Sequence, residues 1–257
     1  MTDPVLAALH SSTQRLSALL GPLPDEVISG PAYPSEWSIA DVLSHLGSGS
    51  VIAARRLADG LAGTAPPDGF NEHVWAAWDA KPPRAKVDDA LAALASLDAS
   101  LSAVAEDDRA RFHTAFGPVT LDWNRFVGMR LNEQLLHEWD VAVALDPASA
   151  LQPDGVELVV DNLEAIAGFA GKPAGRPRTI TVATTGPDRR FEVVVTVGGV
   201  AISAGAARPA GAASDLSMPA EAFIRLVYGR LDPAHTPAGV AGEQDALDQL
   251  RVVFPGF

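Results

Sequence analysis

Four ionisable side chains lie close together in an otherwise apolar segment, LNEQLLHEWDVAVAL, which begins at Leu131. On a helix, spacings of three and four residues return to one face, so Glu133, His137 and Asp140 form a single stripe. Arg130 joins the edge of that stripe. The rest of the segment is apolar nearly all round, which predicts a buried helix. Because burying an unpaired carboxylate is costly, Glu133 needs a metal ion, a cationic partner or a proton.

Two interpretations of this stripe compete. In the structural one, Arg130 pairs with Glu133. His137 then pairs with Asp140, and the polar network only fixes helix packing. The other interpretation is a metal site, which needs a third ligand. His45, in SEWSIADVLSHLGSGS, lies in the middle of a second predicted helix that can face the first one in an up-and-down bundle. Two imidazoles and one carboxylate suit a divalent catalytic metal with an open position, and Asp140 would fix the tautomer of His137.

The elements that must position these residues are mainly helices. Hydrophobic periodicity predicts that the first ~146 residues are almost entirely helical. The expected long helices lie at about 3–20, 38–60, 86–106 and 121–145. This pattern is typical of a four-helix bundle. Ser38 and Asp41 have the spacing of a capping box at the start of the second helix. The segment GTAPPDGFNEHVWAAWDAKPPR, between the second and third helices, is predicted to be a packed loop or short helix that could roof a pocket.

The pattern changes after LDPASALQPDG, at residues 145–155, where we place a domain boundary. Beyond it we expect a helix at about 154–170 and a hairpin formed by RTITVATT and RFEVVVTVGG. Two more helices follow, in MPAEAFIRLVYGR and EQDALDQLRVVF, with Gly229 suited to a C-terminal cap. The sequence therefore predicts an α+β protein with a helical domain at residues 1–150 and a small α/β domain at 151–257.

Composition limits the possible functions. The chain has 257 residues, 47% of them hydrophobic, and a net charge of −13, which argues against nucleic acid and anionic membranes as partners. It has no cysteine, so any thiol chemistry must use an imported thiol. No apolar run reaches the roughly 18 residues that span a bilayer, and we expect a cytoplasmic protein. Phosphate-binding loops, dinucleotide-binding glycine motifs and serine-hydrolase elbows are absent from the sequence.

Three segments resemble one known family. PSEWSIADVLSHL, RLNEQLLHEWDVAVAL and FIRLVYGRLD followed by VVFPGF are similar to segments of the mycothiol-dependent maleylpyruvate isomerases, part of the DinB-like superfamily of metal-binding four-helix bundles. The resemblance covers nearly the whole chain. It implies that His45, Glu133 and His137 are metal ligands. We expect the metal to be Zn²⁺, with Asp140 and Arg130 supporting the ligands from behind. It also implies a C-terminal domain related to sterol carrier proteins and a catalytic role for Arg230.

The chemistry implied by this resemblance agrees with the residue inventory. Mycothiol would be the thiol cosubstrate, and a coordinated metal lowers the pKa of a bound thiol. Addition of the thiolate to a conjugated double bond gives a single bond that can rotate, and elimination returns the trans isomer. The expected function is isomerisation or thiol transfer on a small maleylpyruvate-like electrophile, with Arg230 suited to holding a carboxylate.

Two alternatives stay open at this point. The protein is a binding module if its C-terminal domain holds an apolar ligand or lipid and the polar stripe is structural. It is a non-haem iron enzyme if the same three ligands hold Fe(II). The partners we expect are a small-molecule substrate and a low-molecular-weight thiol, with no nucleic acid and no membrane, in a monomer or homodimer.

Overall fold

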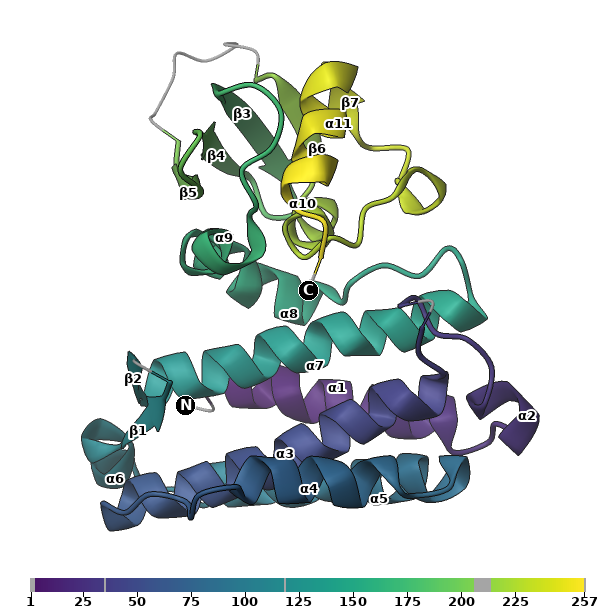
Figure 1. Cartoon of the computed structure of the whole chain (residues 1–257), viewed down its shortest axis with the longest axis vertical. Coiled ribbons are helices and arrows are strands. Elements are labelled where there is room, and N and C mark those ends of the chain that lie inside the picture. Colours follow the sequence, from purple (N-terminus) through teal and green to yellow (C-terminus); the bar gives the residue numbers. More distant parts are fainter. Residues whose placement is uncertain (1–2, 35, 118, 206–213, 257) are drawn as a thin grey trace. The chain divides into compact units, whose positions relative to one another are not determined.

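In a computed structural model, the chain folds into two compact units, Met1–Ala150 and Leu151–Phe257 (Figure 1). The structure describes residues 3–34, 36–117, 119–205 and 214–256. The first unit is helical and the second combines helices with a sheet, which confirms the predicted α+β class. Each unit is described separately below.

Four long helices form the first unit: α1 (Pro4–Leu20), α3 (Ile39–Ala62), α5 (Pro83–Ser102) and α7 (Trp123–Leu145). Helix α3 contacts α5 and α7, and α1 contacts the same two helices from the other side (Figure 1). This closed arrangement is the four-helix bundle that the periodicity predicts. It brings α3 beside α7, and these two helices carry the ionisable residues of interest.

Helix α3 begins where the sequence predicts. The Ser38 hydroxyl accepts a hydrogen bond from the backbone N–H of Asp41, and the Asp41 carboxylate accepts one from the backbone N–H of Ser38, both at 3.1 Å. This confirms the capping box, which satisfies two N–H groups that a helix start leaves open. Gly63 ends the helix with φ +67°, a left-handed conformation that glycine adopts without strain.

The region between the long helices differs from the sequence-based expectation. It contains short helices α2 (Asp25–Ile28), α4 (Phe70–Asp79) and α6 (Glu106–Arg111), and an antiparallel pair of strands, β1 (His113–Phe116) and β2 (Val119–Asp122). The expectation that residues 1–146 are almost entirely helical is therefore wrong at the strand pair. Threonine, phenylalanine and valine favour strands there, and Gly117 has φ +57° between them.

Close packing fixes helix α4 against the bundle. A Cβ atom on Gly47 of α3 would lie 2.3 Å from the Trp78 ring, so glycine at this position lets the indole approach the α3 backbone. Trp78 is 5% exposed and belongs to the main hydrophobic core of the unit. The segment between the second and third long helices is therefore a packed helix, in line with the prediction of a packed loop or short helix.

The second unit contains a five-stranded sheet in the order β5-β4-β3-β6-β7. Its strands are β3 (Arg178–Thr185), β4 (Arg189–Val195), β5 (Val200–Ala204), β6 (Leu216–Pro219) and β7 (Ala241–Gly242). Strands β3 and β4 pair antiparallel from Arg178 opposite Val195 to Thr184 opposite Arg189, which confirms the predicted hairpin. The parallel pairing of β3 with β6 was not predicted.

The helices of the second unit are α8 (Pro153–Val159), η1 (Val160–Asn162), α9 (Leu163–Ala170), α10 (Ala220–Val227), η2 (Pro233–His235) and α11 (Gln244–Val253). A single helix at 154–170 was predicted, but a 3₁₀ turn divides it into α8 and α9. Gly229 follows α10 with φ +72°, as expected for a C-terminal cap. A Cβ atom there would lie 2.2 Å from the backbone nitrogen of Gly256, so no larger residue fits.

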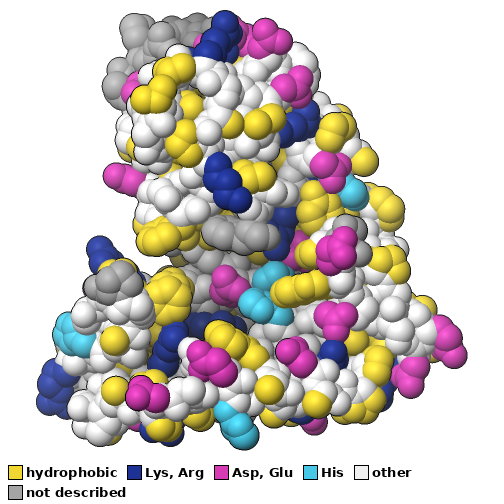
Figure 2. All heavy atoms as spheres, viewed as in Figure 1, with side chains coloured by type: hydrophobic (Ala, Val, Ile, Leu, Met, Phe, Trp, Pro, Cys, Tyr) yellow, Lys and Arg dark blue, Asp and Glu magenta, His cyan; other side chains and the backbone are white. Residues whose placement is uncertain are grey.

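Acidic side chains are scattered over the visible surface among basic and apolar ones, and do not gather in one patch (Figure 2). Among the described helices, none is both long enough and apolar enough to cross a membrane.

Candidate metal centre

Three potential metal ligands converge inside the bundle. His45 comes from α3, and Glu133 and His137 come from successive turns of α7. One ligand atom from each residue lies within 4.8 Å of the other two. The His45 Nε2 atom is 3.1 Å from Glu133 Oε2, and His137 Nε2 is 3.7 Å from the same oxygen. Two imidazole nitrogens and a carboxylate oxygen around one point are a donor set that fits a divalent cation.

Asp140 supports this donor set from behind. Its carboxylate is fully buried, and Oδ2 lies 2.8 Å from His137 Nδ1. A carboxylate at that distance holds a proton on Nδ1, which leaves the lone pair of Nε2 directed toward Glu133 and His45. The contact therefore selects the tautomer that a metal-binding histidine needs.

The three ligand side chains differ in exposure. Those of His45 and Glu133 are 41% and 45% exposed, whereas that of His137 is 11% exposed. The Trp37 ring covers part of the group, with its centroid 5.4 Å from the His45 ring and 6.3 Å from the His137 ring. The centre is thus anchored on one side and reachable on another, as a catalytic metal site requires.

The charges around Glu133 keep it ionised. Burial alone would raise the pKa of Glu133, but the hydrogen bond with His45 and the electrostatic interactions with His137, His45 and Arg130 outweigh burial and lower it to about 2. A carboxylate that is ionised throughout the neutral range is ready to bind a cation.

Arg130 does not form the hydrogen-bonded pair with Glu133 that the structural interpretation of the stripe predicts. Its Nε and Nη2 atoms are buried without a hydrogen-bond partner among the described residues. Burial lowers the pKa of Arg130, the negative charge of Glu133 raises it, and the positive charge of Arg56 lowers it. The second pair of the structural interpretation, His137 with Asp140, is present. Glu133, however, is hydrogen bonded to His45.

A pocket of about 190 Å³ adjoins the centre, and His45 and Glu133 form part of its wall. Asn71 and Trp75 of α4 also line it, as expected of a segment that roofs a pocket. Arg56, another wall residue, was not predicted from the sequence, because one arginine in a long helix is common on protein surfaces.

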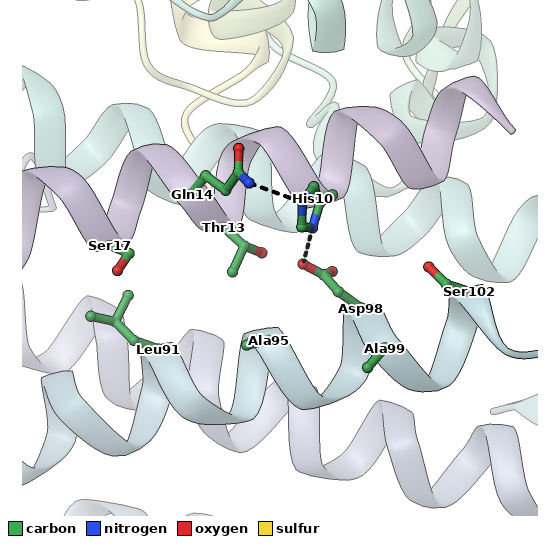
Figure 3. A pocket seen from close by; sticks show the side chains of 9 residues that line it. All are labelled: His10, Thr13, Gln14, Ser17, Leu91, Ala95, Asp98, Ala99 and Ser102. Atoms are coloured by element: carbon green, nitrogen blue, oxygen red, sulfur yellow. Dashed lines mark hydrogen bonds and ion pairs between the residues drawn. The ribbon is translucent and has the colours of Figure 1, made fainter. Parts of the chain in front are cut away.

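Another cavity, of about 380 Å³, lies between α1 and α5 (Figure 3). It contains a pair formed by His10 and Asp98, with Nδ1 and Oδ2 3.8 Å apart, and Gln14 is 3.0 Å from the other ring nitrogen. Across the described residues, the group around Glu133 is the one set of three side chains placed to hold a metal.

Arg230 lies in the second unit, just after α10. Its guanidinium donates to the carbonyl oxygen of Tyr228 at 3.0 Å. The segment that carries Arg230 is held by Arg225, which is 3% exposed, binds both carboxylate oxygens of Glu221 at 2.7 and 2.9 Å, and donates to the His235 carbonyl oxygen at 2.8 Å. The burial of Arg225 could not be predicted from the sequence, because burial of an arginine depends on tertiary packing.

Comparison with protein-family models assigns both units of the chain to one family. The Mycothiol maleylpyruvate isomerase N-terminal domain matches residues 9–142, and the MDMPI C-terminal domain matches residues 151–249. The chain belongs to the mycothiol maleylpyruvate isomerase family. This confirms the family resemblance drawn from the sequence.

Similar proteins and solved structures show how far the likeness extends. The chain is 29% identical to the uncharacterized proteins MT0763 and Rv0738, from two strains of Mycobacterium tuberculosis, over 170 residues that make up 66% of this chain and 80% of each relative. The crystal structure of the mycothiol-dependent maleylpyruvate isomerase matches with a TM-score of 0.64 and 15% identity, over 94% of this chain and 95% of that one. A histidine-to-alanine mutant of that isomerase gives a TM-score of 0.63 at 15% identity, over 90% and 92%. The shared fold therefore includes both units.

Proposed function

We propose that this protein is a metal-dependent and mycothiol-dependent enzyme that isomerises, or transfers a thiol to, a small electrophile resembling maleylpyruvate. The observation that carries the proposal is the convergence of His45, Glu133 and His137 within 4.8 Å. Family membership supports the thiol. The absence of cysteine from the sequence adds to this support, because a thiol reaction here needs an external sulfur.

Three residues would hold the metal ion, for which we propose Zn²⁺. Glu133 contributes a negative charge, His45 and His137 contribute neutral nitrogens, and Asp140 keeps the His137 proton on Nδ1. Such a site leaves the ion positively charged overall and open to an exogenous ligand. When bound there, the metal would lower the pKa of a coordinated thiol, so that the thiolate is present at neutral pH.

The reaction that this arrangement suits is reversible addition to a conjugated double bond. As the new C–S bond forms, the electron pair of the double bond moves to the conjugated carbonyl oxygen. Rotation about the resulting single bond precedes return of that electron pair, cleavage of the C–S bond and release of the thiol. The chain's contribution is to bind and orient the reactants in the pocket beside Glu133.

We also propose that Arg230 acts as a catalytic residue by binding a carboxylate of the substrate. The planar fork of an arginine matches a carboxylate. The support for this role is the resemblance of the YGR segment to the family. The contacts of Arg225 give that segment a defined conformation. Replacing Arg230 with lysine keeps the charge but loses the fork, so turnover should fall while metal content is unchanged.

Elemental analysis of the purified protein tests the proposal, with His45→Ala and Glu133→Ala variants analysed in parallel. About one zinc per chain, lost in both variants, is the result expected of a three-ligand site. Metal-free protein, even after incubation with zinc, iron or nickel, would contradict it and favour a binding module. Oxygen-dependent turnover with bound iron would favour the non-haem iron alternative. The cytoplasmic location and the monomeric or homodimeric state stay predictions.

A further inference from the structure

The pocket beside the metal centre contains two guanidinium groups, Arg56 from α3 and Arg130 from α7. From these we propose that the bundle itself contains a carboxylate-binding site, in which Arg56 and Arg130 hold one carboxylate of a small unsaturated acid. This inference deepens the proposed function and rests on it for the identity of the reacting molecule. The binding site is argued from the first unit alone.

Arg130 is the strongest reason to expect an anion. Its Nε and Nη2 atoms are buried, and no partner for them exists within the described parts of the chain. A buried N–H group without an acceptor is costly, so such groups are normally satisfied by a ligand or water. Gly49 of α3 makes room for this side chain, because a Cβ atom there would lie 3.2 Å from Arg130 Nη1.

Arg56 adds a second positive charge at the same pocket. Its guanidinium carbon lies 4.9 Å from the centroid of the Phe116 ring, which orients it without neutralising it. Among the described residues, Arg56 forms no ion pair with an acidic side chain. No acidic side chain of the described chain influences its pKa, which burial lowers. Glu133, the acidic residue of the pocket wall, is already hydrogen bonded to His45. The pocket therefore has unbalanced positive charge in a protein whose net charge is −13.

The rest of the wall favours a small organic acid over phosphate. Trp75 and Phe116, 45% and 40% exposed, contribute aromatic surface to the pocket. The volume of about 190 Å³ is below the roughly 300 Å³ at which pockets for drug-sized ligands begin. Phosphate sites are commonly built from backbone N–H groups at helix N-termini, but Arg56 and Arg130 lie within their helices. A planar carboxylate on a flat, conjugated chain matches both the forks and the aromatic walls.

The position of Arg130 connects this site to the metal centre. It precedes Glu133 by three residues on α7, so both side chains lie on one face of the helix. A carboxylate held by Arg130 would leave the remainder of the acid inside a pocket whose wall includes Glu133 and His45. The two arginines would thus act as positioning residues for an unsaturated acid, with its reactive carbons next to the metal ligands.

Isothermal titration calorimetry with fumarate as the probe tests this site, using the full-length protein both with its metal and after metal removal by EDTA. Arg130→Met and Arg56→Met should each weaken fumarate binding about tenfold or more in both forms, because each removes charge-assisted hydrogen bonds. Arg55→Met is the matched control. It removes a guanidinium from the next position of α3, where Arg55 pairs with Asp59 at 2.7 Å. Its affinity for fumarate should change less than twofold.

Three results would overturn the carboxylate site. They are no fumarate binding to the wild-type protein in either form, unchanged affinity in both arginine variants, and tighter binding of inorganic phosphate than of fumarate. If Arg130→Met fails to fold, as circular dichroism would show, Arg130→Lys and Arg56→Met decide the matter. Elemental analysis reports the metal separately. Loss of fumarate binding in variants that retain metal therefore concerns the arginines. A wild-type protein that binds fumarate but holds no metal before EDTA treatment, even after incubation with zinc, iron or nickel, contradicts only the proposed function.

Discussion

Helix α7 has two polar clusters on different sides, and they differ in whether their hydrogen bonds are complete. One cluster, toward α1, consists of Gln134 and Glu138. The other, toward α3, consists of Arg130, Glu133 and His137. Both interrupt an apolar helix, and both contain an ionisable group that is expensive to bury.

The cluster toward α1 is closed, in the sense that its hydrogen bonds are completed inside the protein. Glu138 is 5% exposed and accepts two hydrogen bonds from Arg15, at 2.6 and 3.1 Å. Gln134 is 1% exposed and donates to the Leu9 carbonyl oxygen at 3.1 Å and to the Thr13 hydroxyl at 2.9 Å. These bonds hold α1 against α7 and are completed inside the protein.

The cluster toward α3 is open. Glu133 is 45% exposed at its side chain, its distance to His137 Nε2 is 3.7 Å, and two nitrogens of Arg130 have no partner within the described chain. The comparison shows that charge in a core helix is not by itself evidence of function. The useful distinction is between hydrogen bonds completed inside the protein and those that a ligand must complete.

The largest expected effect is loss of the metal from the open cluster. His137→Ala removes a ligand and, with it, the contact to Asp140, so we expect stoichiometric zinc binding to be abolished. Elemental analysis after dialysis measures this. Glu138→Gln, on the closed side of the same helix, is the control and should keep about one metal per chain. Retention of metal by His137→Ala would show that the open cluster is not a metal site.

Removing the support behind His137 should have a smaller effect. In Asp140→Asn the amide no longer fixes the proton on Nδ1, and metal affinity should fall about 10- to 100-fold. Competition with a zinc chelator measures the dissociation constant. An affinity equal to that of the wild-type protein would show that Asp140 only packs.

For stability the order of the two clusters should be reversed: a substitution in the closed cluster should destabilise the fold more than one in the open cluster. In metal-free protein, Glu138→Ala removes the two hydrogen bonds between Arg15 and Glu138 and should lower the free energy of unfolding of the bundle by about 2 kcal/mol. Glu133→Ala should cost less, because Glu133 is 45% exposed and solvent can replace its contacts. Urea denaturation followed by circular dichroism compares the two variants. An equal or larger loss for Glu133→Ala would contradict the distinction between closed and open clusters.

The smallest effect is a pH dependence of the metal-free protein. The pKa of Glu133 is lowered to about 2 from its usual 4.5, so its ionised form stabilises the fold above about pH 4.5. That contribution is lost as pH falls from 4.5 toward 2. The difference in unfolding free energy between wild type and Glu133→Gln should therefore shrink on acidification from pH 6 to pH 3. A constant difference would show that Glu133 is not held in its ionised form.

Local order was largely predictable from the sequence. Helix periodicity located the four long helices, and the spacing of Ser38 and Asp41 predicted a cap that the structure contains. The spacing of four residues placed Glu133 and His137 on one face, because helix geometry fixes that relation whatever the surroundings. Alternating β-branched residues likewise predicted the β3–β4 hairpin.

Tertiary structure decided which of these residues meet. His45 lies 88 positions before Glu133, and its Nε2 reaches the carboxylate only because α3 packs beside α7. Which carboxylate of α7 is closed by Arg15 and which stays open also depends on the neighbouring helix and not on α7 itself. The same holds for Arg56 and Gly49, ordinary residues in the sequence that packing places at one pocket wall. Local periodicity determines the face on which a side chain lies, but packing between distant segments determines what that face contacts.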